Sequence, residues 1–334
     1  MASHSHREGH QQSQDHEHGH RHAEEDMLSV EEAFQRIMAS FSPLEAEDVS
    51  LLDCLGQVLA EDIQSPLDLP PLSNSAMDGY AVLSADIQGA SPESPRNLEV
   101  IGLVAAGQGS NQTVVSGVAI RIMTGAPIPA GADAVVPFEE TDEVERRQAG
   151  RPLDQVAIYS SLPVGVNVRP AGEDVRRGQQ VLDAGTPIRP AEIGVMASLG
   201  LTSARVIRRP VVSILATGDE LVASGRSLGE GKIFDSNSVS VAGSVLACGG
   251  IPRVLGIARD NLEDLNNKLT EAAGSDLIVT SAGVSKGDYD IVKDVLTERG
   301  DMNFWSVRMR PAKPLAFGHL REDGGRSVPL LGLP

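Results

Sequence analysis

The chain has 334 residues, of which 41% are hydrophobic, 22% charged and 3% aromatic, and its formal net charge is −18. This length predicts two or three domains, with cores built mainly from aliphatic side chains. The negative charge argues against nucleic acid and against an anionic membrane surface as partners.

Residues 1–26 form a polar segment that holds seven of the eight histidines. Because it has almost no apolar residues, we expect it to be disordered. Two interpretations stay open: a solvated tail with incidental metal affinity, or a loose buffer for Zn, Ni or Cu through its imidazoles.

Two helices are predicted next. Ser29 followed by Glu32 is a capping-box pattern at the start of the first. Its apolar residues share one face: Val30, Phe34, Ile37 and Met38. A second helix is expected up to about Leu59, with Ser42 as N-cap and Pro43 as its first residue.

A β-rich region is predicted after the prolines at 66, 70 and 71, which mark a boundary. Short Val- and Ile-rich runs separated by Gly and Pro are typical of a small β domain. They cover residues 98–104, 114–123, 134–137 and 156–159. A helix is expected over residues 191–199.

From Pro210 onward strands alternate with helices, which predicts parallel βαβ units. We expect strands over residues 211–216, 254–257, 277–280 and 327–331, and helices over 238–248 and from Leu262. The C-terminal part is therefore predicted to be an α/β domain.

Acidic residues follow three of these strands: Glu220 (beside Asp219), Asp260 and Asp288. Carboxyl ends of parallel strands meet at one sheet edge, where carboxylates can converge on Mg²⁺. The alternative is that each acid caps a helix. Three such acids in one domain favour a metal site.

Small residues and cations suggest an anion-binding region. Residues 281–287 are mostly small and follow a predicted strand, so backbone N–H groups can approach an anion there. Arg308, Arg310 and Lys313 lie on a stretch stiffened by Pro311 and Pro314. Convergent cations on a stiff loop suit phosphate or an oxyanion.

Three stretches of the β-rich region also stand out: residues 74–80, 121–127 and 172–174. They contain Asp78, Thr124 and Asp174 beside glycines. From the residues alone, each stretch is read either as an ordinary turn or as part of a site.

Taken together, these motifs are specific. In chain order they are residues 70–82, 121–129, 172–174, 217–221, 234–237, 281–289 and 308–318. In them the chain resembles the molybdopterin molybdenumtransferases, the MoeA family that includes the gephyrin E domain.

The resemblance implies insertion of molybdate into adenylylated molybdopterin (molybdopterin-AMP), with release of AMP and a need for Mg²⁺. It implies the catalytic residues Asp78, Thr124, Asp174, Glu220, Asp260 and Asp288, of which Glu220, Asp260 and Asp288 would hold the metal. It implies cofactor binding by Ser281, Gly283, Ser285, Gly287, Arg308, Arg310 and Lys313.

The implied fold is a multidomain α/β protein. An elongated helical domain would cover residues 27–69 and 174–206, a small β-rich domain 70–173, and a doubly wound molybdopterin-binding α/β domain 207–334. A homodimer with a shared cleft is implied, and an upstream molybdopterin adenylyltransferase is an expected partner.

The sequence departs from the family pattern at Ala282 and Ala312, where Gly is common, and at Ser306, where some members carry Lys. The family pattern continues beyond Pro334 into a further β domain, so we expect the chain to be C-terminally truncated. A non-catalytic, gephyrin-like scaffold is the alternative function.

The sequence has no apolar run of about 18 residues, which predicts no transmembrane helix. Its two cysteines, Cys54 and Cys248, fit a reducing compartment better than a disulfide scaffold. We therefore expect a cytoplasmic protein.

Overall fold

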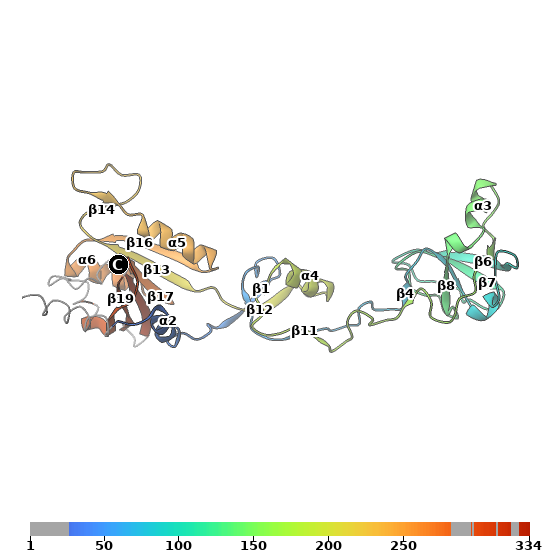
Figure 1. The fold of residues 1–334 in the computed structure, drawn as a ribbon, viewed down its shortest axis with the longest axis horizontal. Coiled ribbons are helices and arrows are strands. Elements are labelled where there is room, and N and C mark those ends of the chain that lie inside the picture. Colours follow the sequence, from blue (N-terminus) through green and yellow to red (C-terminus); the bar gives the residue numbers. More distant parts are fainter. Residues whose placement is uncertain (1–26, 282–294, 296, 312, 322–326) are drawn as a thin grey trace, which may run out of the picture. The chain divides into compact units, whose positions relative to one another are not determined.

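The computed structural model describes residues 27–281, 295, 297–311, 313–321 and 327–334 (Figure 1). They divide into two compact units: residues 48–206, and residues up to 47 together with 207–334. The predicted disordered tail lies outside the described residues. Within the described part of the chain, no helix has the length and apolar character needed to cross a membrane.

A five-stranded sheet forms the β-rich part of the first unit, with strand order β8-β5-β7-β6-β9. The strands are β5 (Gly79–Val82), β6 (Arg96–Val104), β7 (Val118–Ile122), β8 (Ala134–Pro137) and β9 (Gln155–Ile158). Successive residues of β5 enter different core clusters: Tyr80 and Val82 pack on one, and Ala81 on the other. Both faces of the sheet are therefore buried.

Shorter elements connect to this sheet. They are η1 (Ser84–Ile87), η2 (Phe138–Glu140), helix α3 (Glu143–Gln148) and the pair β4 (Asn74–Ser75) and β10 (Val168–Arg169). Strand β10 pairs with β4 in antiparallel fashion. This pairing links the chain before β5 to the chain after β9.

The rest of the first unit is mixed, although we expected it to be helical. Strand β12 (Ser203–Ile207) lies between β1 (Ala46–Ser50) and β2 (Val58–Leu59), and β3 (Ile63–Gln64) pairs with β11 (Gln180–Leu182). Helix α4 (Pro190–Ser198) confirms the helix predicted at 191–199. Leu59, Ile188 and Met196 lie in its core. The domain boundaries predicted at 69/70 and 173/174 stay predictions.

The helix predicted from Pro43 to Leu59 is wrong. These residues form β1, a turn and β2 instead. Gly56 adopts a φ of 81°, which ends any helix and turns the chain. Strand β12, some 150 residues away in sequence, supplies the hydrogen-bonding edge, so tertiary pairing overrides local propensity.

Glu192 gives a prediction about acid stability. Its carboxylate accepts hydrogen bonds from the guanidinium of Arg189 (2.9 Å) and the backbone N–H of Arg189 (2.9 Å). These bonds, led by the guanidinium, lower the pKa of Glu192 to about 2. Because the folded-state pKa is depressed, the stabilisation is present above the unfolded pKa near 4.5 and is lost as the pH falls toward 2.

NMR titration of Glu192 should therefore show a midpoint at about pH 2, well below the ordinary glutamate value of 4.5. The Glu192→Gln variant should lose less stability between pH 5 and pH 2 than the parent chain. Identical acid-unfolding profiles would contradict this assignment.

The second unit contains a six-stranded sheet with strand order β16-β13-β17-β20-β19-β18. The strands are β13 (Val211–Thr217), β16 (Ile251–Ala258), β17 (Leu277–Ser281), β18 (Gly300–Ser306), β19 (Pro314–Arg321) and β20 (Ser327–Leu333). Strands β13, β16, β17 and β20 are mutually parallel, and β19 is antiparallel to both its neighbours, β18 and β20. A small parallel pair, β14 (Leu221–Val222) and β15 (Ile233–Phe234), follows β13.

Helices cover both faces of this sheet. Leu215 of β13 packs with Leu265 and Leu269 of α6 (Leu262–Glu271). The preceding residue, Ile214, packs in a separate cluster against α5 (Asn237–Ala247). Since successive strand residues point to opposite faces, the two helices lie on opposite sides. The doubly wound α/β prediction is confirmed, and so are its predicted strands and helices.

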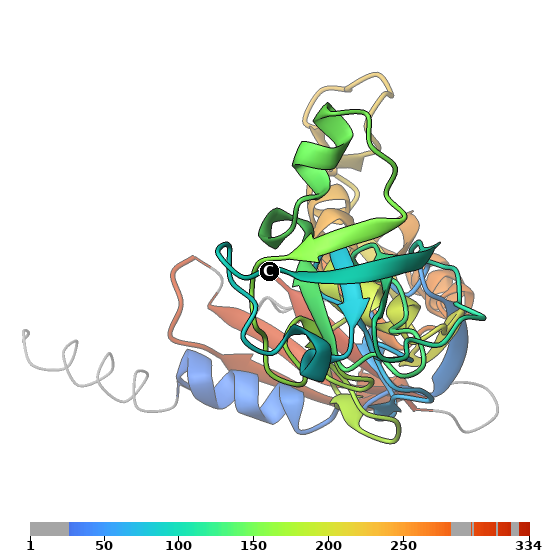
Figure 2. The same ribbon diagram turned by 90° about the vertical axis from the view of Figure 1, so that its right-hand side faces the viewer.

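Helix α2 (Val30–Met38) has the predicted capping box: Glu32 N–H donates to Ser29 Oγ (3.1 Å), and Ser29 N–H donates to Glu32 Oε2 (2.8 Å). The helix packs on the α/β unit, where Ala33 joins a cluster with Val307 and Leu315. Figures 1 and 2 show this blue helix beside the red strands. We had predicted that this helix belongs to the same domain as residues 174–206.

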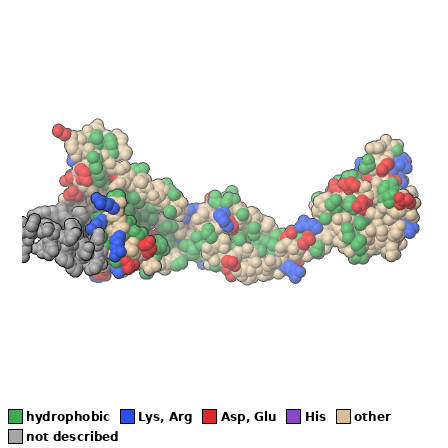
Figure 3. Space-filling view, viewed as in Figure 1, with side chains coloured by type: hydrophobic (Ala, Val, Ile, Leu, Met, Phe, Trp, Pro, Cys, Tyr) green, Lys and Arg blue, Asp and Glu red, His purple; other side chains and the backbone are tan. Residues whose placement is uncertain are grey.

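Most of the apolar stripe of α2 faces outward, but its remaining residue, Ile37, packs with Ala33 in the cluster described above. Val30, Phe34 and Met38 are 45%, 61% and 49% exposed. An amphipathic helix usually turns such a stripe to a core. Figure 3 shows one face of the described residues, on which acidic and basic side chains are spread among apolar ones.

Candidate functional site

The carboxyl edge of the six-stranded sheet collects several predicted site segments. The parallel strands β13, β16 and β17 end there at Thr217, Ala258 and Ser281. Strand β18 also ends at this edge, because two antiparallel pairings in succession restore the direction of β20. The turn after β13, Asp260 and the 307–313 loop therefore share one edge, where open α/β sheets bind ligands.

A cavity of about 310 Å³ opens at this edge. Its polar lining comes from Thr217, Glu220, Asp235, Ser236, Asn237 and Ser281. Residues 235–237 lead into helix α5, and the carboxylate of buried Asp235 accepts a hydrogen bond from the N–H of Ser238 (3.0 Å). The cavity thus combines two carboxylates with hydroxyl and amide groups.

The position of Glu220 depends on Gly218. The glycine has a φ of 142°, and a Cβ there would lie 2.5 Å from Oε2 of Glu220. The Ile233 N–H donates to the backbone oxygen of Glu220 (2.9 Å) and holds the following turn. A side chain at position 218 would thus displace the Glu220 carboxylate.

The turns after β13 and β16 touch each other. The N–H of Asp260 donates to Oδ1 of Asp219 (3.4 Å), and Lys232 Nζ donates to the backbone oxygen of Asp219 (2.6 Å). Asp260 is therefore brought next to Asp219, the residue before Glu220, although Asp260 is not among the residues that line the cavity.

Helix capping does not account for Glu220 or Asp260. Helix α6 is capped by Asn261, whose Oδ1 accepts from the N–H of Asp264 (2.8 Å), and not by Asp260. Glu220 precedes the short strand β14 and begins no helix. The third predicted acid, Asp288, lies outside the described residues.

The donor set suits Mg²⁺, which takes oxygen ligands and is often held by one or two carboxylates with phosphate and water. Glu220 and Asp260 supply such carboxylates. Among the described residues no group of three or more acidic, histidine or cysteine side chains is close enough to hold a metal by itself. A metal here would need a ligand's oxygens or residues outside this set.

The basic loop lies farther along the edge. Val307 N–H donates to the oxygen of Lys313 (2.8 Å) and closes the loop, while Arg308 Nε donates to the oxygen of Met27 (3.2 Å). Arg308, Arg310 and Lys313 are exposed. Because β18 is four strands from β13, the loop is offset from Glu220 by about 19 Å at ordinary strand spacing.

Strand β17 lies between the acids and the cations and ends at Ser281, which lines the cavity. The other predicted members of its small-residue loop, Gly283, Ser285 and Gly287, lie outside the described residues. The edge therefore offers an extended surface, acidic at one side and basic at the other, that suits a long anionic ligand.

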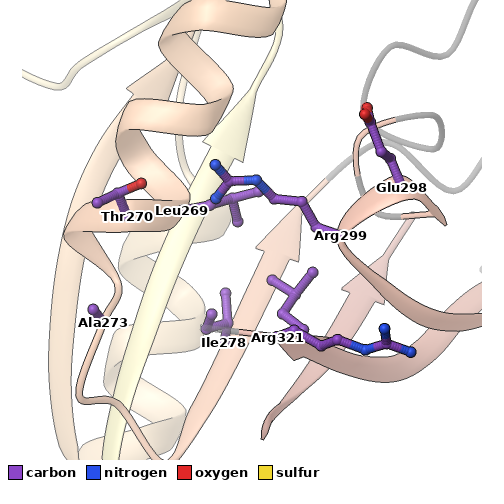
Figure 4. A pocket seen from close by; sticks show the side chains of 8 residues that line it. Leu269, Thr270, Ala273, Ile278, Glu298, Arg299 and Arg321 are labelled. Atoms are coloured by element: carbon purple, nitrogen blue, oxygen red, sulfur yellow. The ribbon is translucent and has the colours of Figure 1, made fainter. Parts of the chain in front are cut away.

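A larger cavity of about 470 Å³ lies between α6 and the opposite end of the sheet (Figure 4). It is bordered by Ile278 near the start of β17 and by Arg321 at the end of β19. The side chains of Glu298 and Arg321 point away from Thr270 in Figure 4. Because it lies away from the carboxyl ends, we assign the site to the smaller cavity.

In the first unit, Asp78 and Thr124 are in direct contact. Oδ1 of Asp78 accepts from the N–H of Thr124 (2.6 Å) and from its hydroxyl (2.7 Å). These two bonds lower the pKa of Asp78 below its usual range. The pairing of Gly79 with Ile122 brings the two residues together.

Asp174 reaches the same region through Arg169, whose guanidinium donates to both oxygens of Asp174 (3.0 and 2.9 Å). Arg169 is in β10, which pairs with β4 just before Asp78. The three stretches that the sequence alone left open, residues 74–80, 121–127 and 172–174, thus lie close to strand β4.

Sequence reasoning missed Asp235, Ser236 and Asn237 as site residues. Their stretch, residues 234–237, was one of the matching motifs, and an acid immediately before a predicted helix was the available signal. Only the packing of β15 beside β14 shows that they line the same cavity as Glu220.

Comparison with known proteins places this geometry in a family. Residues 28–200 match the MoeA N-terminal region (domain I and II), and residues 213–334 match a probable molybdopterin binding domain. The molybdopterin molybdenumtransferase of Haemophilus influenzae is 37% identical over 299 residues, which are 88% of this chain and 70% of that protein. Molybdopterin molybdenumtransferase 2 of Mycobacterium tuberculosis is 38% identical over 92% of this chain and 75% of that protein.

A solved structure agrees with these relatives. The molybdopterin biosynthesis MoeA protein of Pyrococcus horikoshii superposes with a TM-score of 0.77 and 31% identity, covering 92% of this chain and 74% of that one. With both halves of the chain matched and the sheet edge built as described, the chain belongs to the molybdopterin molybdenumtransferase (MoeA) family.

Proposed function

We propose that this chain, a transferase of molybdenum cofactor biosynthesis, inserts molybdate into adenylylated molybdopterin and releases AMP in a Mg²⁺-dependent reaction. The observation that carries the proposal is the sheet edge with carboxylates at the β13 and β16 ends and cations after β18. Molybdate and an adenylylated substrate are both anionic, so bringing them together requires positive charge to offset their repulsion.

Each group of site residues has a proposed role that follows from the chemistry of its side chains. Glu220, Asp260 and Asp288 would hold Mg²⁺, which when bound would polarise the adenylyl phosphoryl group as a Lewis acid. Arg308, Arg310 and Lys313 position anionic groups by charge and hydrogen bonds. Ser281 and the small residues Gly283, Ser285 and Gly287 let backbone N–H groups approach the ligand.

Asp78, Thr124 and Asp174 contribute from the first unit. The contact between Asp78 and Thr124, together with the pair of Asp174 and Arg169, makes a polar region that suits the hydrogen-bonding edge of a pterin. The pKa of Asp78 lies below its usual range because Thr124 donates two hydrogen bonds to it, so Asp78 acts as an acceptor at neutral pH.

We further propose a homodimer, with the stripe of Val30, Phe34 and Met38 as part of the surface covered by the second copy. Three large side chains so exposed on one helix face favour burial against a partner. A molybdopterin adenylyltransferase would supply the substrate. The two cysteines, one buried and one exposed and neither in a disulfide, fit a cytoplasmic location.

The deciding experiment incubates the chain with adenylylated molybdopterin, Mg²⁺ and molybdate and measures AMP. We expect release that depends on molybdate and is lost with EDTA. Removing residues 1–26 should not change it, because their sequence offers almost no apolar side chains to bury. Loss of release on removing the tail would favour metal delivery through its histidines.

Binding of adenylylated molybdopterin without molybdate-dependent release of AMP would contradict the enzymatic proposal. It would favour the alternative, a non-catalytic gephyrin-like scaffold with the same fold.

A further inference from the structure

A largely buried arginine contacts the two strands that carry Asp78 and Thr124. Arg121, in β7, has a side chain that is only 12% exposed. Its guanidinium carbon lies 5.3 Å from the ring centre of Tyr80 and 5.6 Å from that of Phe138. These aromatic contacts fix the plane of the guanidinium group.

The guanidinium bridges the two strands that carry Asp78 and Thr124. Nη1 of Arg121 donates to the backbone oxygen of Gly79 (3.0 Å) and to that of Ile122 (2.9 Å). Gly79 directly follows Asp78, and Ile122 is two residues before Thr124. A shift of the guanidinium would therefore move both members of the Asp78–Thr124 contact.

Glu143, in helix α3, anchors the arginine from the other side. Its side chain is 3% exposed, and its Oε2 lies 2.7 Å from Nε of Arg121. Burial raises the pKa of Glu143, but hydrogen bonds from Tyr80, Arg147 and Arg121 outweigh it and lower the pKa overall. Glu143 is thus a buried carboxylate that balances the charge of Arg121.

We propose that Arg121 and Glu143 form a buried positioning pair that holds Asp78 and Thr124 in the geometry needed to bind substrate. Neither residue touches the ligand; they act through the backbone on either side of the contact. The expected effect on AMP release rests on the proposed function. The expected effect on Asp78 rests only on the contacts described above.

The test uses Arg121→Lys, with Arg147→Ala as the matched control. Lysine keeps the charge but lacks the planar fork that serves two carbonyls and a carboxylate together. Arg147 also pairs with Glu143 (2.9 Å), but it is 60% exposed and is not among the donors to Gly79 or Ile122. The two readouts are the pKa of Asp78, from carbon-detected NMR, and the kinetics of AMP release.

In Arg121→Lys we expect the pKa of Asp78 to rise toward its ordinary value and KM to rise at least 10-fold, with a smaller change in kcat. Arg147→Ala should leave the pKa of Asp78 unchanged and should change the kinetic constants of AMP release by less than twofold. An unchanged pKa of Asp78 in Arg121→Lys would overturn the proposal. If that variant does not fold, Glu143→Gln answers the same question, and an unchanged pKa there overturns it equally.

The two proposals can fail separately. A shifted pKa of Asp78 in a chain that never releases AMP would refute the proposed function and leave the positioning pair intact. Normal turnover with an unshifted pKa in the variants would refute only the positioning pair.

Discussion

Replacing Glu220 by glutamine should lower AMP release by about 100-fold or more, the usual cost of removing one preorganised charged or hydrogen-bonding group from an active site. Glutamine keeps the shape of glutamate but loses its charge. The side chain is exposed at the cavity, so folding stability should change by no more than about 0.5 kcal/mol. Rates at several Mg²⁺ concentrations, together with thermal unfolding, give both quantities.

The control is Glu263→Gln. Glu263 is also exposed and is in the same unit, but it lies in the first turn of α6 and does not line the cavity. Its variant should turn over normally. Equal activity of the Glu220 and Glu263 variants at limiting Mg²⁺ would end the assignment of Glu220 to the metal.

A second variant separates charge from position. Gly218→Ala keeps the carboxylate of Glu220 but places a Cβ against its oxygens, at a φ that side chains rarely adopt. We expect it to reduce AMP release as well, with a larger loss of stability than Glu220→Gln because the backbone itself is strained.

Replacing Asp276 by alanine should destabilise the α/β unit by about 2–4 kcal/mol, because it removes the buried one of the two carboxylates that pair with the partly buried Arg208. The carboxylate of Asp276 accepts hydrogen bonds from both Nη groups of Arg208 (2.6 and 2.8 Å) and from the N–H of Val211 (2.8 Å). Its side chain is 6% exposed and that of Arg208 is 28% exposed. Three donors thus lose their acceptor at the start of β13.

Urea unfolding followed by tryptophan fluorescence measures this loss, since the single tryptophan, Trp305, is in the same unit. The control is Glu45→Ala, which removes a second partner of Arg208 (2.8 Å) that is 78% exposed. Exposed ion pairs contribute about 0–1 kcal/mol. Equal effects of the two variants would contradict the importance of burial.

Strands and helices with strong periodicity were predictable from the chain. The α/β elements after Pro210 and the capping box at Ser29 are confirmed because their signals are local: apolar runs, alternation, and an acceptor three residues from a donor. The helix predicted from Pro43 to Leu59 is wrong because its fate depends on a strand near residue 205. No local pattern in residues 43–59 shows that partner.

The candidate site divides in the same way. That Glu220 and Asp260 follow strands is a property of the sequence, and so is their charge. That neither caps a helix, that Asp235 and Asn237 line the same cavity, and that Arg121 reaches the carbonyls beside Asp78 are properties of packing.

The sequence by itself determined the family, the alternation of strands and helices, and the kinds of side chain available to bind anions and metal. The tertiary structure alone decided which of them meet, because strand order and register bring residues that are far apart in the sequence to one sheet edge. It also left Val30, Phe34 and Met38 of α2 exposed, since Ala33 and Ile37 face the sheet instead. Periodicity shows that a helix has an apolar face; only the packing of the neighbouring strands decides whether that face is buried.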